Sequence, residues 1–299
     1  MNRAAAASRV ATMLPWAWLL VFVAAPLVVV AKISLSESAV AQPPYRPRWS
    51  WTLDPAAWQA FADGLGLDSY RALLADDLYW RSALASLAIA SAATAILVLV
   101  GYPVALAMAR APKRLRPVLL AIVILPFWTS FLIRVYAWIA ILRPAGLLDA
   151  ALGLFGLPPL ELLNSTPAVL IGIVYAYLPF MVLPIYAVLE RRDPALLEAA
   201  ADLGAGTVAT FRTVTLPLSR PGLASGVLLC FVPIFGEFVI PDLLGGSDTL
   251  MLGRTLWSEF FGNRDWPLAS AVAIVMLLAL ALPLAWLRES GLRRGDARR

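Results

Sequence analysis

Six long apolar stretches determine what this chain can fold into. Within its 299 residues they occupy 13–31, 82–109, 118–142, 168–189, 222–240 and 268–287. A helix of about 20 residues crosses the hydrocarbon core of a bilayer, and inside that core only helices and closed barrels satisfy their backbone hydrogen bonds. The sequence therefore predicts an all-α membrane protein of six transmembrane helices, built as a single domain over 1–299.

The composition restricts the chemistry of the chain. It is 61% hydrophobic and 14% charged, with no histidine and a single cysteine, Cys230, inside an apolar run. Soluble domains carry about 25% charged residues. Histidine-based catalysis, a Cys/His metal site and an intramolecular disulfide are excluded. The sequence also has no Walker-type phosphate-binding run. We therefore expect neither an enzyme nor a metal or cofactor site on this chain.

The basic residues indicate how the chain is oriented. With the N-terminus in the cytoplasm, fifteen of the 24 Lys and Arg residues are cytoplasmic, including Arg3, Arg9 and four in the short loop 110–117. Cytoplasmic loops carry the excess of positive charge, and long outer loops such as 32–81 count for little. This distribution predicts an N-in, C-in topology, and it argues against a nucleic-acid surface. The first stretch is too long for a signal-peptide core, so we expect an uncleaved helix.

Two outer segments have more than one interpretation. The periplasmic loop 32–81 holds a Pro-rich aromatic stretch that includes Trp49 and Trp51, and 241–267 holds Trp257, Phe260 and Trp266. Aromatic side chains anchor proteins at the membrane interface. Docking of a soluble partner from outside is the alternative.

The cytoplasmic loop 190–221, between the fourth and fifth stretches, has strong helix signals. Asp193 is a good N-cap ahead of Pro194, and Gly204 suits a left-handed turn that ends the helix. A second short helix is expected from Thr207 to Thr213, ending before Pro217. Such a short helix needs a partner groove for its apolar face. A hairpin packed on its own bundle is the alternative.

The same loop resembles the EAA motif of the permeases of bacterial ABC importers. The matching residues are Glu198, Ala199, Ala200, Gly204, Val214, Leu216 and Pro217, with Val214 where the family pattern has Ile. The resemblance implies that this segment is a coupling helix that sits in a cleft of the ATPase subunit. It also implies a multi-pass protein of the bacterial inner membrane.

The resemblance implies a set of partners as well. Two copies of an ABC ATPase subunit would carry ATP and magnesium, beside a second homologous permease, a periplasmic binding protein and membrane lipid. ATP binding would drive alternating access. A stand-alone channel, a secondary transporter or a membrane enzyme are the alternatives from other classes, and none of them needs a coupling helix.

Three further runs resemble the permeases of bacterial polyamine importers. They are LPFWTSFLIRVYAW at 125–138, FGEFVIPDLLGG at 235–246 and SEFFGNRDWPLASAVAI at 258–274. The resemblance implies polyamine import, with putrescine as the expected substrate and a periplasmic polyamine-binding protein as a partner. Spermidine, another small cation, a ferric ion or an opine are the alternatives.

Two charged residues inside apolar runs are candidates for the substrate pathway. Straight helices place Glu237 roughly 22 Å and Arg134 roughly 24 Å from the cytoplasmic ends of their stretches. The two form a buried ion pair in one interpretation. In the other, Glu237 and Asp242 guide a polycation past the aromatic side chains of Trp128, Tyr136 and Phe238. Both remain open, as does alternation between them.

Overall fold

The computed structural model describes residues 13–48, 54–247 and 249–296, with side chains up to Leu282. Arg3, Arg9, Trp49 and Trp51 lie outside the described residues. The chain forms two compact units, one of Met1–Trp80 with Thr255–Arg299 and one of Arg81–Arg254.

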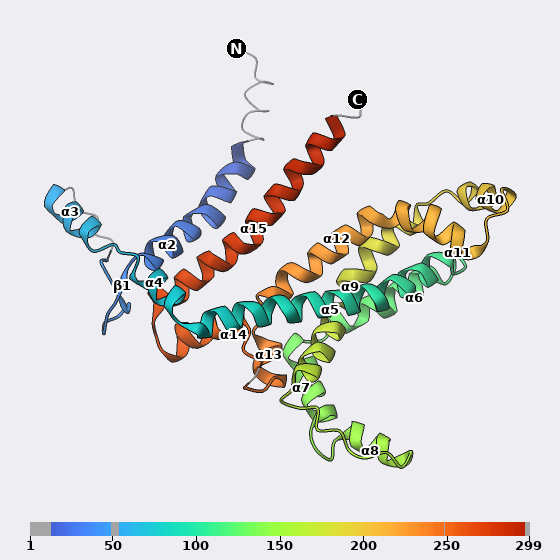
Figure 1. Cartoon of the computed structure of the whole chain (residues 1–299), viewed down its shortest axis with the longest axis horizontal. Coiled ribbons are helices and arrows are strands. Elements are labelled where there is room, and N and C mark those ends of the chain that lie inside the picture. Colours follow the sequence, from blue (N-terminus) through green and yellow to red (C-terminus); the bar gives the residue numbers. More distant parts are fainter. Residues whose placement is uncertain (1–12, 49–53, 248, 297–299) are drawn as a thin grey trace. The chain divides into compact units, whose positions relative to one another are not determined.

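The first unit consists of two long helices and a small cap (residues 35–76). Its first helix runs over Met13–Ser34 and contains a π-helical turn, η1 (Leu20–Ala24), followed by α2 (Ala25–Ser34). The last helix, α15 (Trp266–Asp296), follows the π-helical turn η4 (Ser258–Gly262) and packs along α2 (Figure 1). The cap contains β1 (Glu37–Ser38), β2 (Tyr45–Arg46), α3 (Pro55–Asp63) and α4 (Asp68–Ala75).

The cap adds one short hairpin to a chain that is otherwise helical, as expected. Strands β1 and β2 pair antiparallel, with Glu37 opposite Arg46. Pro43, Pro44 and Pro47 surround the second strand, and proline lacks the amide donor that a helix interior needs. The segment folds as a hairpin for that reason.

The second unit contains the remaining helices, which are coloured from teal to orange in Figure 1, although the first turn of α5 and the last turn of α14 belong to the first unit. Five of them form the apolar helices or the bent helix pair of this unit: α5 (Asp77–Arg110), α6 (Arg116–Ile124), α7 (Phe131–Leu142), α9 (Thr166–Glu190) and α12 (Leu216–Phe235). The shorter elements are η2 (Leu125–Trp128), α8 (Leu147–Leu154), α10 (Ala195–Asp202), α11 (Thr207–Thr210), η3 (Phe211–Thr215), α13 (Val239–Leu244) and α14 (Leu252–Trp257).

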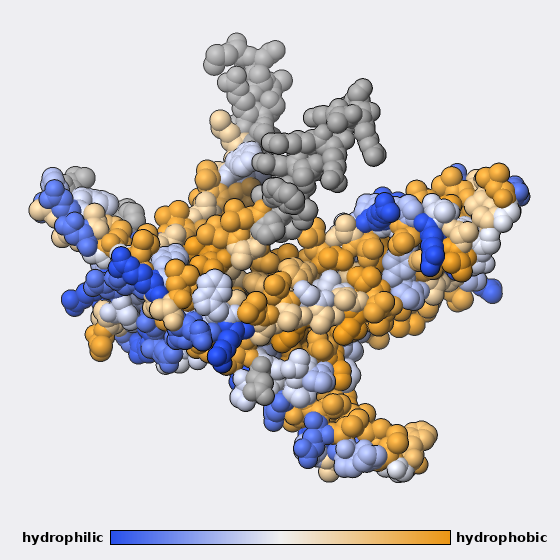
Figure 2. Space-filling view, in the orientation of Figure 1, coloured by the Kyte–Doolittle hydropathy of each residue, from blue (hydrophilic) through white to orange (hydrophobic). Residues whose placement is uncertain are grey.

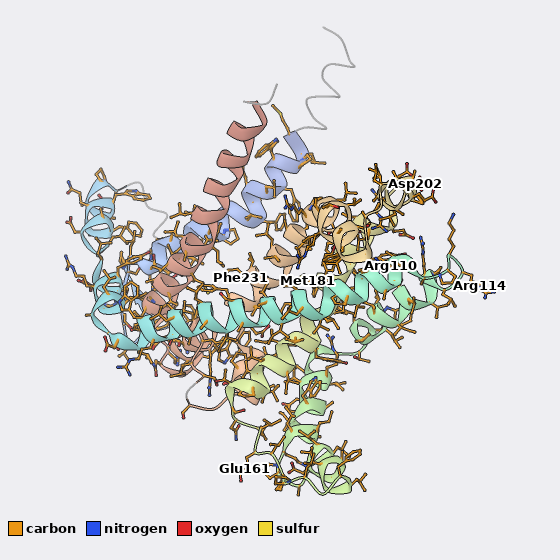
Figure 3. All side chains as sticks on the ribbon, turned by 45° about the vertical axis from the view of Figure 1, so that its right-hand side comes forward. Arg110, Arg114, Glu161, Met181, Asp202 and Phe231 are labelled. Carbon is orange, nitrogen blue, oxygen red and sulfur yellow. The ribbon has the colours of Figure 1, made fainter. Side chains whose placement is uncertain are left out.

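The core of the second unit is the contact between α9 and α12, its most extensive helix pair. Gly222 on α12 lies directly against the backbone of α9, where an added Cβ would be 2.6 Å from the Pro184 carbonyl oxygen. Met181 fills the space beside Gly226, and it is fully buried. Glycine permits this close approach, as it does where membrane helices pack. In Figure 3, Met181 lies well inside this unit.

The third apolar stretch is broken, which corrects the straight helix expected at 118–142. Arg116–Trp128 and Phe131–Leu142 are bent by 89° relative to one another. Pro126 lies in the 3-10 turn η2, the Thr129 hydroxyl donates to the Pro126 carbonyl at 2.8 Å, and Thr129 is extended. The missing proline amide and the extended residue interrupt the helix. The depth expected for Arg134 along a straight helix is therefore wrong.

The fifth stretch also differs from its expected bounds of 222–240. A continuous helix runs over Thr207–Phe235, through α11, η3 and α12, and then breaks before α13. The helix predicted to end before Pro217 does not end there. The π-helical turn η3 ends at Thr215, two residues before Pro217, and its wider winding accommodates a residue without an amide donor.

The expected stretches 13–31, 82–109 and 168–189 each lie within one long apolar helix. Four described helices are long and apolar enough to cross a membrane, and the bent pair raises this number to five. The stretch 268–287 lies within α15, and the part of it with described side chains forms the apolar helix Trp266–Leu282. Apolar side chains cover most of the helical surface that Figure 2 shows, as expected where lipid or another subunit is the neighbour.

Candidate functional site

Glu237 lies in the break between α12 and α13, and its side chain is buried. Its Oε1 accepts hydrogen bonds from the backbone amides of Phe238, at 3.2 Å, and Val239, at 3.0 Å. Its Oε2 accepts one from the Tyr177 hydroxyl at 2.7 Å. Both carboxylate oxygens are therefore held by donors, as a buried charge requires.

A row of three aromatic rings leads away from this carboxylate. Tyr177 lies 6.0 Å from Phe180, and Phe180 lies 5.1 Å from Phe127 in an edge-to-face arrangement, both measured between ring centroids. We call Tyr177, Phe180 and Phe127 the aromatic row. Beyond its end, the Arg134 guanidinium carbon is 5.1 Å from the Phe127 centroid. The aromatic row therefore lies between the buried Glu237 carboxylate and the Arg134 guanidinium.

Arg134 and Glu237 form no ion pair in the structure, so the paired interpretation does not describe this conformation. The guanidinium instead lies over Phe127 and, at 5.7 Å, over Phe131. Its Nε and Nη1 atoms are buried, and within the described part of the chain neither has a hydrogen-bond partner. Cation–π contact with Phe127 and Phe131 replaces only part of the solvation that a guanidinium loses on burial.

The other residues expected in the pathway differ in exposure and in their partners. Asp242 accepts from Arg254 Nε at 3.1 Å, an ion pair that anchors α13. Trp128 and Tyr136 project outward and are 82% and 58% exposed. Phe238 is partly buried beside Glu237. The six expected residues therefore do not form one cluster.

The sequence analysis missed the aromatic row altogether. Tyr177 and Phe180 are three residues apart on α9, a spacing that places them on one face of a helix. That spacing is the only local signal, because Glu237 and Phe127 come from distant parts of the chain.

The EAA segment has the local structure that its sequence predicts. The Asp193 carboxylate accepts from the Ala195 amide at 3.0 Å and so caps α10. Gly204 has a φ of +75°. Its amide donates to the Ala201 carbonyl at 2.8 Å, and the next amide reaches back to Ala200 at 3.0 Å. This is a Schellman motif, which glycine favours because it lacks a Cβ.

The apolar side of this segment has no cover within the described chain. Leu196, Leu203 and Val208 are 46%, 88% and 65% exposed. Among the described elements, helix α10 contacts chiefly α11 and η3. Glu198 and Ala199 are exposed too, and among the described residues the Glu198 carboxylate has no partner.

The two basic loops of the second unit lie at the same end. In Figure 3, Arg110 and Arg114 lie near Asp202, whereas Glu161 lies at the opposite end. Arg116 Nη1 is 3.7 Å from Glu190 Oε1, and Arg192 donates to the Thr215 hydroxyl at 3.1 Å. Burial, and then the positive charge of Arg110, lower the pKa of Arg192.

The described residues contain no group of three or more His, Cys, Asp or Glu side chains that would hold a metal ion.

A protein family and several relatives match this chain. Residues 101–289 match the family described as "Binding-protein-dependent transport system inner membrane component". The spermidine/putrescine transport system permease protein PotB of Haemophilus influenzae is 39% identical over 269 residues, which are 89% of this chain and 88% of that protein. The protein of the same name from Escherichia coli is 41% identical over 220 residues, covering 73% and 80%.

A solved structure shares the fold. A bacterial ABC transporter that imports the acidic polysaccharide alginate has a chain that matches with a TM-score of 0.67, at 18% identity, over 95% of this chain and 94% of its own. Its likeness is evidence for the fold alone. Taken with the family match and the relatives, it shows that the chain belongs to the binding-protein-dependent inner membrane components, the permease subunits of bacterial ABC importers.

Proposed function

We propose that this chain is the permease subunit through which an ATP-driven importer moves polyamines into the cytoplasm. The observation that carries the proposal is its 39% identity, along 89% of its length, with a spermidine/putrescine permease. The names of such relatives include both amines, and putrescine is our choice for the substrate. The expected ferric-ion and opine substrates receive no support from these relatives.

The proposed topology has six spans with both termini in the cytoplasm, within a single transmembrane domain. The four long apolar helices, the bent pair and α15 supply the six. The common end of the basic loops around Arg110 and Arg192 supports a cytoplasmic position for that end. The bent pair would then be a span that breaks where the pathway needs irregular backbone.

The EAA segment is the proposed contact with the ATPase. It ends in a rigid Schellman motif, and it exposes Leu196 and Leu203 together with the unpartnered Glu198. A short helix with an uncovered apolar side fits a groove of another protein. Two ATPase copies, a second permease and a periplasmic binding protein complete the proposed machine.

Glu237 is the proposed polyamine contact, together with the aromatic row. A carboxylate attracts an ammonium group, and ring faces accept cations at little cost in desolvation. Asp242 forms an ion pair with Arg254. In this conformation its carboxylate is therefore occupied, and we do not assign it to the polyamine contact.

The test is uptake of labelled putrescine by the complete complex in proteoliposomes, with ATP inside and the binding protein outside. We expect ATP-dependent uptake, with spermidine competing more weakly than unlabelled putrescine. Uptake that proceeds without ATP would indicate a channel or a secondary transporter. Absence of uptake for both amines would refute the polyamine assignment.

A further inference from the structure

The cap of the first unit has a cavity of about 310 Å³ with an arginine at its edge. Hairpin residues 38–41 and Pro44 line one side, and Asn263 and Arg264 line the other. None of these lining residues is acidic. Val40 is fully exposed at the tip of the hairpin, so the rim of the cavity is open to a partner.

Arg264 has an unusual backbone for an arginine. Its φ is +55°, in the left-handed region that side chains with a Cβ seldom adopt. Such strain persists only where neighbouring residues enforce it, and it is frequent at ligand-binding positions. The side chain is exposed, and among the described residues it has no hydrogen bond or ion pair.

The residues on both sides of Arg264 hold it in place. Glu259 is buried, and its carboxylate accepts from the Asn263 side-chain amide at 2.8 Å and the Tyr79 hydroxyl at 3.1 Å. The Asp265 amide donates to the Glu259 carbonyl at 2.9 Å, and the Asp265 carboxylate accepts from the Leu268 amide at 3.0 Å. The turn is therefore rigid, although its guanidinium is unpaired.

Aromatic contacts join this turn to the hairpin on the opposite side of the cavity. Trp266 stacks on Phe260 at 4.8 Å, and its ring lies 6.2 Å from Tyr45 in β2. The hairpin and the turn thus form one preorganised surface, which lowers the conformational cost of binding.

We propose that this cavity receives an acidic side chain of the periplasmic binding protein, with Arg264 as its partner. The inference rests on the proposed function, in which the cap faces the periplasm and a binding protein delivers the amine. A protein that captures a polycation needs carboxylates around its binding cleft. The free guanidinium of Arg264 is complementary to such a carboxylate, and it repels the ammonium groups of the cargo.

The experiment measures binding of the amine-loaded binding protein to the complete complex in nanodiscs. Arg264→Gly is the decisive variant, because glycine keeps the left-handed backbone without strain while the whole side chain, with its guanidinium, is lost. We expect its Kd to rise about tenfold or more, as the loss of a charge-assisted hydrogen bond predicts. Arg264→Glu should weaken binding further, and the ATPase rate without binding protein should stay unchanged.

Arg71→Ala is the matched control, since that cap arginine is exposed and already paired with Asp68 at 2.9 Å. Its Kd should change by less than about threefold. Rescue of Arg264→Glu by an acid-to-lysine change on the binding protein would identify the partner carboxylate.

Two results would overturn the proposal. One is an unchanged Kd for Arg264→Gly, or one equal to that of Arg71→Ala, in a wild-type complex that takes up amine. The other is loss of co-purified anionic lipid from Arg264→Gly with binding unaltered, which would assign the cavity to a lipid headgroup. Failure of wild-type uptake itself would refute the proposed function instead.

Discussion

Tyr177 donates its hydroxyl to Glu237 across 60 positions of sequence, at 2.7 Å, and so ties α9 to the break between α12 and α13. The bond leaves Glu237 with its charge fully hydrogen-bonded while its backbone departs from helical geometry. The same carboxylate thus stabilises an irregular segment, and it is also the group that we propose as the polyamine contact.

Tyr177→Phe should destabilise the complex by about 1–3 kcal/mol, because it leaves a buried carboxylate oxygen without its donor. Thermal unfolding in detergent measures the loss, and labelled-putrescine uptake should fall with it. Tyr175→Phe is the control. The Tyr175 ring contacts the Trp138 ring in a T-shaped arrangement with 5.4 Å between centroids, and phenylalanine can keep that contact. Equal effects of the two variants would contradict a specific role for the Tyr177 bond.

Glu237→Gln should reduce uptake about tenfold or more, since it removes the charge that attracts an ammonium group, an interaction of about 1.5–3 kcal/mol. Co-purification with the ATPase and the second permease should be unaffected. Glu161→Gln, at an exposed position in the loop between α8 and α9, is the comparison. Wild-type uptake by Glu237→Gln would remove this residue from the pathway.

Arg134→Met should leave the melting temperature unchanged or raise it, because two buried nitrogen atoms without partners are replaced by apolar atoms of similar length. Uptake should nevertheless fall if the guanidinium takes part in transport. Arg143→Met changes an exposed arginine beyond the end of α7 and controls for the loss of charge. A large drop in stability for Arg134→Met would show that the guanidinium has an anionic partner in the assembled complex.

Gly204→Ala should strain the Schellman motif by about 1–2 kcal/mol, because alanine is disfavoured at a φ of +75°. We expect weaker stimulation of ATP hydrolysis by the loaded binding protein. Gly206→Ala is the matched control: a Cβ at either glycine meets open space, and Gly206 has an ordinary φ of −67°. Identical coupling in both variants would argue against the role of the turn.

Gly222→Ala should weaken the contact between α9 and α12 by about 1–3 kcal/mol, because its Cβ would overlap the Pro184 carbonyl. The loss would be measured as a lower melting temperature of the purified complex. Gly153→Ala, where a Cβ meets nothing within 4 Å, should be neutral. A neutral result for Gly222→Ala would mean that the two helices can separate without cost.

Local signals in the sequence were sufficient for the EAA segment. Asp193 and Gly204 are a cap and a turn residue whose effect extends over a few neighbours, and the structure confirms both. The break at Thr129 was not predictable in this way, because membrane helices often tolerate a proline such as Pro126. The Tyr177–Glu237 bond depends on packing between distant helices, for which one sequence has no signal.

The second half of the EAA segment, from Thr207 to Pro217, is the first part of the uninterrupted helix Thr207–Phe235. The 29 residues of this helix form a rod of roughly 43 Å, and the far end of that rod is the break that holds Glu237. Because no loop interrupts this helix, a tilt imposed at Thr207 would reach Glu237 as a displacement rather than be absorbed at a joint. Pro217, Pro221 and Pro233 lie in this rod, so in the proposed importer they would set its stiffness, and with it the share of a nucleotide-driven movement that reaches Glu237.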